Sequence, residues 1–238
     1  MKSKLWIQSL DDVKKNPYDC QSQELFMNEA LLLLDELFIK YDKYQRHFSV
    51  DERTLKKALW MLHLDILDTL RDCIDLLKKK KHRIVGKLFR DIQENIDLAT
   101  LFWEQRRSNP ANLAKWYENK VIPHRKFRQH LKNAKGNSAA NYSRVIYEEL
   151  SQWPHHCYVK LTNSYVLGGD DGNRIIYDGH WEILIPPQTI SQYTWLIKDS
   201  ILYFFSNVKS VGLIDWNEFT IFLNRTIQGL VFSKINNP

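Results

Sequence analysis

Residues 55–77 read LKKALWMLHLDILDTLRDCIDLL, and this stretch decides the fold class. Its apolar side chains recur in steps of three and four residues, which places them on one side of an α-helix. The opposite side carries aspartates. Such a helix must bury its apolar side against other helices, so the stretch predicts a helical bundle. The apolar stripe consists of Leu55, Leu59, Leu62, Ile66, Leu70, Cys73 and Leu77, and the aspartates are Asp65, Asp68, Asp72 and Asp75.

The segments on either side repeat this spacing. Residues 24–46 and 85–102 each carry one apolar stripe. The breaks between the three segments are short, and short connections make consecutive helices antiparallel neighbours. Three long antiparallel helices are therefore expected.

Proline and glycine mark the next boundaries. Asn109-Pro110 predicts the start of a fourth helix, and Pro123 predicts a break or kink in it. Gly136 predicts its end, because glycine readily takes the left-handed conformation that follows many helices. A fifth helix is expected over 138–153.

The sequence pattern changes between residues 157 and 185. Residues 158–162 and 174–177 are β-type runs, and Asp178-Gly179 is a strong signal for a two-residue hairpin turn. We therefore predict a small β-hairpin insert near 157–185.

Two apolar helices are expected after this insert, over 188–208 and 216–233. Asp215 and Glu218 form a capping-box arrangement at the start of the second. The sequence thus predicts a mainly α fold, an antiparallel bundle of about seven helices in one domain. Its parts are an N-terminal prelude (1–20), the helical bundle (24–156), the β-insert (157–185) and a C-terminal helical pair packing on the bundle (188–238).

Composition limits the class of protein. With 238 residues, 44% of them hydrophobic, the chain can form one large core. Cys20, Cys73 and Cys157 are odd in number and far apart, and the N-terminal MKSKLWIQSLDDVKK lacks the apolar core of a signal peptide. Reduced thiols and a cytoplasmic location are expected. The most apolar stretch, 193–205, is interrupted by charges and too short to cross a bilayer, so no membrane partner is expected.

The net charge of +6 favours a polyanionic partner, and a first group of cations lies at a predicted turn between two helices. Clustered cations neutralise phosphates and bind RNA without sequence preference. The alternative is a solvated turn whose lysines complement the C-terminus of the preceding helix. The group consists of Lys78, Lys79, Lys80, Lys81, His82 and Arg83.

A second basic group occupies segment 123–135, which contains no acidic residue. Phe127 and Leu131 can anchor it on the bundle while its cations follow a polyanion. The alternative is a solvated surface helix, or one that pairs with the aspartates of 65–75. The basic side chains are His124, Arg125, Lys126, Arg128, His130, Lys132 and Lys135.

Two further segments resemble a known family. The order of elements, the motif LFRDIQE at 88–94 and the segment YEELSQWPHH at 147–156 resemble helical proteins of the HEPN superfamily, over roughly residues 24–158. The resemblance implies a bundle of four or five helices, usually a homodimer. It also implies metal-independent RNA cleavage by an Arg followed after four to six residues by a His, and a role in toxin–antitoxin or antiphage systems.

One place that matches this motif lies in the basic segment. Arg125 and His130 have the required spacing, with Lys126 where the family prefers a small polar residue or His. The resemblance makes Arg125 and His130 catalytic candidates.

The other place follows the fifth helix. His156-Cys157-Tyr158 resembles a His-x-Tyr variant of the motif, with Ser151 where the Arg would stand. Arg144, two turns upstream on the same helix, is the nearest alternative cation. This alignment adds His156, Tyr158 and Arg144 as candidates and makes hydrolysis depend on a cation from elsewhere.

Other polar residues have ordinary explanations. Arg90 and Glu94 share one helix side with Lys87 and Asp97, where they line a polar groove or form a surface ion-pair ladder. His63, at the edge of its apolar stripe, is expected to be a boundary histidine rather than a ligand.

No metal or cofactor is expected. The histidines and Cys157 around the β-insert match none of the zinc spacings, and residues 170–173 lack the ligands of a calcium loop. The sequence also contains no Gly-rich phosphate loop, nucleophile elbow or dinucleotide fingerprint.

Two functions remain. The first is a HEPN-like RNA-directed protein, active as a metal-independent endoribonuclease or as a toxin component. The alternative is a non-catalytic interaction protein that binds a protein partner through aromatic C-terminal helices, although most aromatic side chains at helical spacing belong to a core. These aromatics are Tyr193, Trp195, Tyr203, Phe204, Phe205, Trp216, Phe219 and Phe222.

Overall fold

The computed structural model describes residues 2–43, 47–108, 110–152, 165–168, 174–177 and 187–227 of the chain. Helices form most of this part, which confirms the mainly α prediction. The helices are η1 (Lys4–Trp6), α1 (Leu10–Lys15), α2 (Cys20–Asp42), α3 (Leu55–Lys78), α4 (His82–Gln105), α5 (Ala111–Tyr117), α6 (Arg125–Ser151), α8 (Pro187–Val211) and α9 (Trp216–Ile227).

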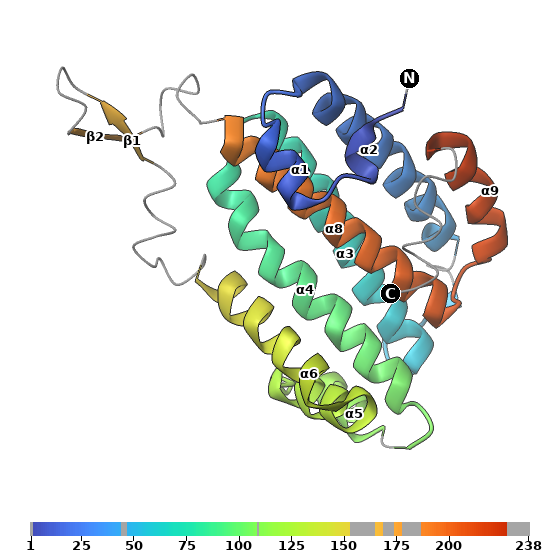
Figure 1. Ribbon diagram of the computed structural model, residues 1–238. Coiled ribbons are helices and arrows are strands. Elements are labelled where there is room, and N and C mark those ends of the chain that lie inside the picture. Colours follow the sequence, from blue (N-terminus) through green and yellow to red (C-terminus); the bar gives the residue numbers. More distant parts are fainter. Residues whose placement is uncertain are drawn as a thin grey trace.

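Four long helices, α2, α3, α4 and α8, surround the main core (Figure 1). They meet because each carries an apolar stripe, and the stripe of α3 is buried from Leu59 to Leu77. α8 also supplies the aromatic side chains Tyr193, Phe204 and Phe205 to this core, and α9 adds Phe219. Most aromatics of the C-terminal helices are therefore core residues, as their spacing predicts.

The N-terminal residues belong to the core as well. Trp6 is fully buried, and its indole Nε1 donates a hydrogen bond to Glu29 on α2 over 2.8 Å. Leu5 and Val13 join the same apolar cluster. The segment predicted to be an N-terminal prelude is thus packed against α2 and α8.

A chain of buried hydrogen bonds crosses all four long helices. Tyr41 on α2 bonds His63 Nδ1 on α3 over 2.6 Å, and His63 Nε2 bonds Asn207 on α8 over 2.7 Å. Asn207 then donates to Thr100 on α4 over 2.8 Å. His63 is fully buried rather than at the boundary, and burial lowers its pKa to about 4, so it is neutral at physiological pH.

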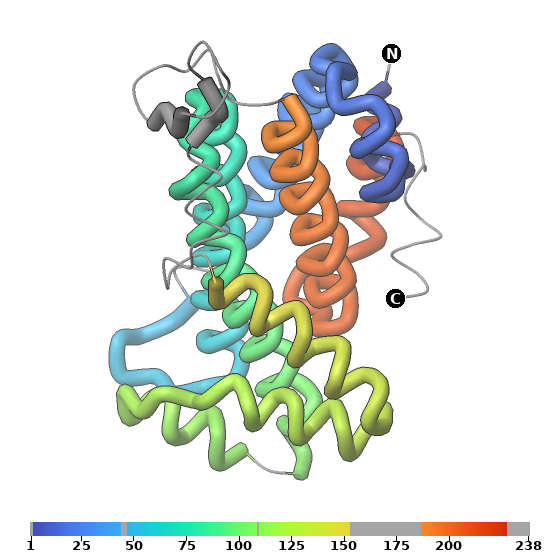
Figure 2. The backbone as a smooth tube through the Cα atoms, turned by 60° about the vertical axis from the view of Figure 1, so that its left-hand side comes forward, coloured from blue at the N-terminus to red at the C-terminus, as the bar shows by residue number. Residues whose placement is uncertain are grey.

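Helices α5 and α6 lie across one end of the bundle (Figure 2). α6 has two arms, because Gly136 breaks it with φ +86° and ψ −179°. The first arm crosses the end of the bundle, and the second turns back along α4. The predicted boundary at Gly136 is confirmed, and the turn brings residues near 147 to α4.

Two short strands are described outside the helices. β1 (Tyr165–Gly168) and β2 (Arg174–Tyr177) pair antiparallel, with Tyr165 opposite Tyr177. β2 coincides with one predicted run. The predicted run 158–162 and the turn at Asp178-Gly179 lie outside the described residues.

Cys20 and Cys73 are free thiols, and burial raises the pKa of Cys73 to about 12. Within the described ranges, no helix is long and apolar enough to cross a membrane.

Candidate functional site

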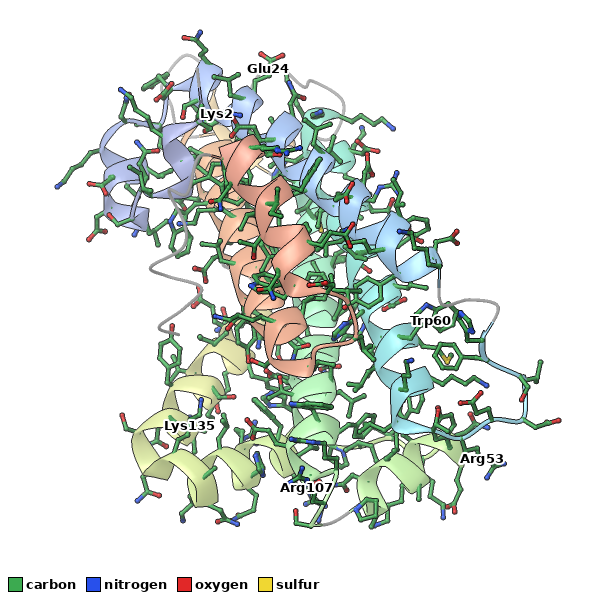
Figure 3. The ribbon with its side chains drawn as sticks, turned by 90° about the vertical axis from the view of Figure 1, so that its right-hand side faces the viewer. Lys2, Glu24, Arg53, Trp60, Arg107 and Lys135 are labelled. Carbon is green, nitrogen blue, oxygen red and sulfur yellow. The ribbon has the colours of Figure 1, made fainter. Side chains whose placement is uncertain are left out.

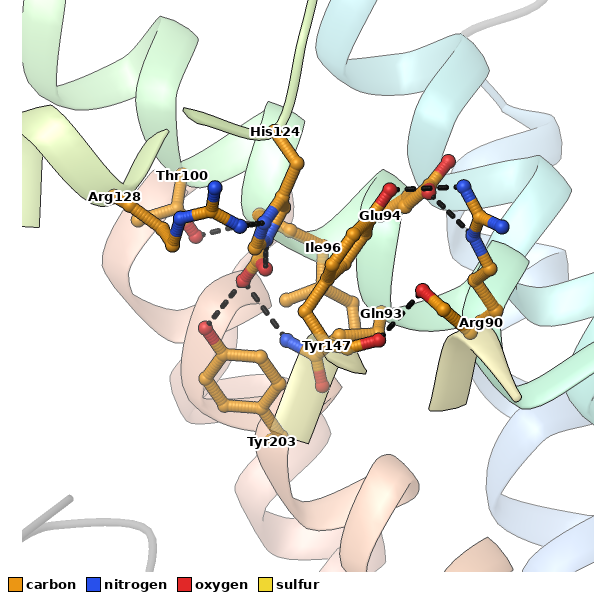
Figure 4. A network of polar contacts seen from close by, with 11 residues as sticks. Arg90, Gln93, Glu94, Ile96, Thr100, His124, Arg128, Tyr147 and Tyr203 are labelled. Carbon is orange, nitrogen blue, oxygen red and sulfur yellow. Dashed lines mark hydrogen bonds and ion pairs between the residues drawn. The ribbon is translucent and has the colours of Figure 1, made fainter. Parts of the chain in front are cut away.

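A cavity of about 320 Å³ lies between α4, the 118–124 connection and α6. α4 lines it with side chains spaced four and three residues apart, which share one side of the helix. The charged and polar lining residues are Arg90, Glu94, Asn95, Asp97, Lys120, His124 and Tyr147. Figure 4 shows several of them converging from α4 and α6.

The centre of this cluster is a histidine–aspartate pair. His124 Nε2 lies 2.8 Å from Asp97 Oδ2, and both side chains are almost entirely buried. Arg128 Nη1 lies 3.2 Å from His124 Nδ1. A guanidinium has only donors, so Nδ1 must accept and the ring proton must sit on Nε2. Arg128 and Asp97 together fix the tautomer of His124.

Asp97 accepts two further hydrogen bonds at Oδ1, from Gln93 and from Tyr203 of α8, each over 2.9 Å. Burial raises the pKa of Asp97, while the bonds from His124, Tyr203 and Gln93 act in the opposite direction. Burial and the neighbouring carboxylate hold the pKa of Tyr203 well above its ordinary value. Tyr203 therefore remains a donor, and a full set of donors surrounds the carboxylate.

Tyr147 forms the opposite wall of the histidine. Its ring stacks on His124 with centroids 4.0 Å apart and planes 7° apart. Arg90 Nη2 donates to Tyr147 Oη over 2.8 Å, and Arg90 Nε pairs with Glu94 over 2.8 Å. The guanidinium carbons of Arg90 and Arg128 lie 5.1 and 5.8 Å from the Tyr147 ring centre. Two arginines thus flank one aromatic ring beside the histidine.

The Arg90–Tyr147 bond joins the two segments on which the HEPN resemblance rests. Arg90 belongs to LFRDIQE at 88–94, and Tyr147 begins YEELSQWPHH at 147–156. They are 57 positions apart in the chain. The motif residues therefore meet at the cavity.

The catalytic candidates in the basic helix do not converge with this cluster. Arg125 is exposed, whereas the half-buried His130 bonds Glu104 at the end of α4. Arg144 is also exposed and pairs with Glu148 on its own helix over 2.7 Å. The remaining candidates, His156 and Tyr158, lie outside the described residues.

The two groups of cations lie at opposite ends of α4. Lys78–Lys81 are exposed at the turn before His82, whereas His130 bonds Glu104. These ends are about 33 Å apart along the helix at 1.5 Å per residue. Arg83 is half-buried next to the first group. One compact phosphate site cannot use both groups.

The basic arm of α6 is anchored as expected by Phe127, which is buried. Lys126 and Lys132 are exposed, whereas Arg128 is half-buried against His124. Among the described contacts, the histidines of this arm and its approach bond acidic residues of α4 rather than the aspartates of α3. These histidines therefore do not follow the alternative in which the segment pairs with the aspartates of 65–75.

The central roles of His124, Tyr147, Gln93 and Tyr203 were missed from the sequence. Arg90, Glu94 and Asp97 were recognised as sharing one helix side, and the structure uses them in a polar cavity rather than in a plain surface ladder. Tyr203 could not be found by pattern, since it reaches Asp97 from a helix 106 positions away.

Chemically, the cavity offers donors, cations and an oriented imidazole. In the part of the chain that the structure describes, no three His, Cys, Asp or Glu side chains are grouped to hold a metal ion. Comparisons with protein-family models, curated proteins and solved structures find no match. The site must therefore be interpreted from its own geometry.

Proposed function

We propose that this protein is an RNA-directed, HEPN-like protein that binds a phosphodiester in the α4–α6 cavity and cleaves RNA without a metal ion. The observation that carries the proposal is the His124–Asp97 pair flanked by Arg90 and Arg128. A general base of fixed tautomer beside two guanidinium groups is what phosphodiester cleavage requires.

Charge supports an anionic ligand at this end of the bundle. Residues 106–135 contain nine Lys and Arg residues and one acidic residue, Glu118. Figure 3 shows Arg53, Arg107 and Lys135 at the same end. Clustered cations attract the RNA backbone and release its counterions, so affinity for RNA must fall steeply with salt.

The chemistry needs one rearrangement. When Arg128 turns from His124 Nδ1 to the phosphate, Nδ1 becomes free to take the proton of a ribose 2′-hydroxyl. The 2′-oxygen attacks phosphorus, the bond to the 5′-oxygen breaks, and His124 returns the proton to that oxygen. The products are a 2′,3′-cyclic phosphate and a 5′-hydroxyl end. Arg90 stabilises the charge on the pentacoordinate phosphorus, in place of the Arg that is missing at Ser151.

The resemblance extends the proposal to the biological setting. It implies a homodimer and a component of a toxin–antitoxin or antiphage system, while the cysteine usage favours a cytoplasmic location. The predicted β-insert at 157–185 and His156 stand close in sequence to α6, so His156 remains a second candidate for the acid–base role.

The test is cleavage of labelled RNA in EDTA by the intact protein and by three variants, His124→Ala, His130→Ala and His156→Ala. We expect 2′,3′-cyclic phosphate ends from the unchanged protein and the loss of at least 100-fold in rate, about the gain from general acid–base catalysis, in His124→Ala. Cleavage that needs a metal ion, or that survives His124→Ala, would overturn the assignment.

One observation favours a non-catalytic RNA-binding protein instead. Both nitrogens of His124 are hydrogen-bonded and its side chain is 6% exposed. If Arg128 stays hydrogen-bonded to Nδ1 when RNA binds, the His124–Asp97 pair only orders the cavity, and His124 cannot act as a base. This alternative predicts RNA binding with the same salt dependence and no cleavage.

A further inference from the structure

A second, more open groove lies beside the α4–α6 cavity. Its volume is about 760 Å³, and its walls come from residues 48–61 and from the end of α5 with the connection that follows. Trp116, Lys120 and Val121 line both spaces, so the groove and the cavity are neighbours that share these residues as a wall. The aromatic lining residues are Phe48, Trp60, Trp116 and Tyr117.

The groove exposes an unusual amount of apolar surface. Val50 and Val121 are 93% and 88% exposed, the highest values for large hydrophobic side chains among the described residues. Met61, also in the lining, is 42% exposed. Exposed apolar surface gathered in one hollow is typical of a binding site.

The walls of the groove are held in place by hydrogen bonds. Trp60 Nε1 donates to the carbonyl of Tyr41 over 2.9 Å, and Tyr117 Oη donates to the carbonyl of Thr54 over 2.7 Å. Lys57 Nζ donates to two carbonyls of the preceding loop over 2.6 and 2.7 Å. The aromatic walls therefore exist before a ligand arrives, which lowers the entropy lost on binding.

The turn after α5 places the shared residues. Asn119 has φ +58°, and the Lys120 N–H donates to the Lys115 carbonyl over 3.0 Å, which is the pattern of a left-handed helix end. Lys120 and Val121 follow directly and stand between the two spaces. A cation and an apolar side chain thus separate an aromatic groove from a cavity rich in donors.

We propose that the aromatic groove binds an unpaired base of single-stranded RNA whose phosphate lies in the α4–α6 cavity. The inference rests on the proposed function and names its substrate class. Aromatic walls stack any base, while the surrounding cations, nine Lys and Arg against one acidic residue over 106–135, complement the backbone. A base inside a duplex is stacked and paired, so it cannot enter the groove.

The test compares two labelled oligomers of about eight nucleotides, a length within the site sizes of single-strand binders. One is 2′-O-methyl RNA, which cannot be cleaved, and the other is an abasic sugar–phosphate chain of equal length. Fluorescence anisotropy gives both affinities for the full-length protein. We expect the oligomer with bases to bind at least about five-fold more tightly, and a duplex to bind no better than the abasic chain.

Variants of Phe48 isolate the aromatic wall. Phe48 contacts Trp60, with ring centroids 5.2 Å apart. Phe48→Leu keeps an apolar side chain but removes one ring of the groove, so it should reduce the preference for bases and leave affinity for the abasic chain unchanged. Phe48→Trp should retain the preference. Phe38→Leu, which changes a half-buried aromatic on α2, is the matched control and should behave as the unchanged protein.

The outcomes separate the two proposals. Equal affinity for the two oligomers, or a preference that Phe48→Leu leaves unchanged, would refute the base groove and leave the phosphate site standing. The same outcome is expected if the groove instead binds an apolar protein partner, because such binding does not require an aromatic ring at Phe48. Failure of both oligomers to bind would remove the proposed function and the inference together.

Discussion

Arg90 on α4 donates a hydrogen bond to the hydroxyl of Tyr147 on α6 over 2.8 Å. This contact helps to hold the second arm of α6, whose Leu150 also packs on the main core, and it orients the Tyr147 ring against His124. Because Arg90 also pairs with Glu94, its guanidinium is fixed at the edge of the cavity before any ligand binds. A cation held in this way suits phosphate recognition.

Replacing Arg90 should therefore weaken RNA binding. Charge-assisted hydrogen bonds contribute about 1.5–3 kcal/mol each, so Arg90→Gln should lower RNA affinity about 10-fold or more. Arg71→Gln is the matched control, because Arg71 also pairs with one carboxylate, Asp35, and lies over an aromatic ring, Phe38. Anisotropy titrations at one salt concentration measure both. Equal losses would mean that only net charge matters.

The two histidine–carboxylate pairs can be separated by amide substitutions. Asp97→Asn removes the acceptor that holds the His124 tautomer and should reduce RNA cleavage at least 100-fold, since a comparable change in serine proteases reduces the rate about 10⁴-fold. Glu104→Gln makes the same change beside His130 and should leave the rate unaltered. The reverse result would assign catalysis to His130, as its spacing from Arg125 predicts.

His63 should make the fold sensitive to acid. Its pKa is about 4 in the folded protein and about 6.5 when unfolded, so the unfolded chain binds more protons between these values. The contribution of neutral His63 to the free energy of unfolding is therefore fully present above pH 6.5. It is lost as pH drops toward 4, by roughly 3 kcal/mol in all. Urea titrations from pH 7 to 4 measure this loss. His63→Gln, which cannot titrate, should show a smaller slope; an identical slope would contradict the assignment.

Gly136 should matter for function beyond its effect on stability. Gly136 and Gly212 both have positive φ, and a Cβ at either would meet no atom within 4 Å. Alanine should cost about 1–3 kcal/mol of backbone strain at both positions. Only Gly136→Ala should also weaken RNA binding, because the bend in α6 carries Tyr147 to Arg90. Thermal melts measure the stability of the two variants, and anisotropy titrations measure their RNA affinity. Equal RNA affinity of Gly136→Ala and Gly212→Ala would show that the bend in α6 does not matter for RNA binding.

Periodic features were predictable from sequence because they depend on local chemistry. The stripe from Leu59 to Leu77 is buried as its spacing requires, and Gly136 ends a helical arm with a positive φ, in an extended conformation that is essentially confined to glycine. Asp215 was expected to cap α9, and its Oδ1 accepts the backbone N–H of Glu218 over 3.2 Å. Each of these is set by neighbours within a few residues.

The site depends instead on contacts between distant segments. From sequence, His124 is one more basic residue of the segment 123–135, and its tautomer is fixed only when Asp97, 27 positions away, approaches it together with Arg128. His63 looked like a boundary residue because its partner Asn207 lies 144 positions away. No periodic pattern encodes such pairs. Sequence spacing likewise does not show that α4 keeps the two groups of cations apart in space.

The location of bound RNA tests the central claim most directly. A 2′-O-methyl oligonucleotide carrying 4-thiouridine can be crosslinked by light to the full-length protein, and mass spectrometry then identifies the crosslinked peptides. Our account predicts crosslinks within residues 48–61, 87–98 and 111–135, on the walls of the cavity and the groove. Crosslinks confined to the turn at 78–84, or none at all, would contradict it.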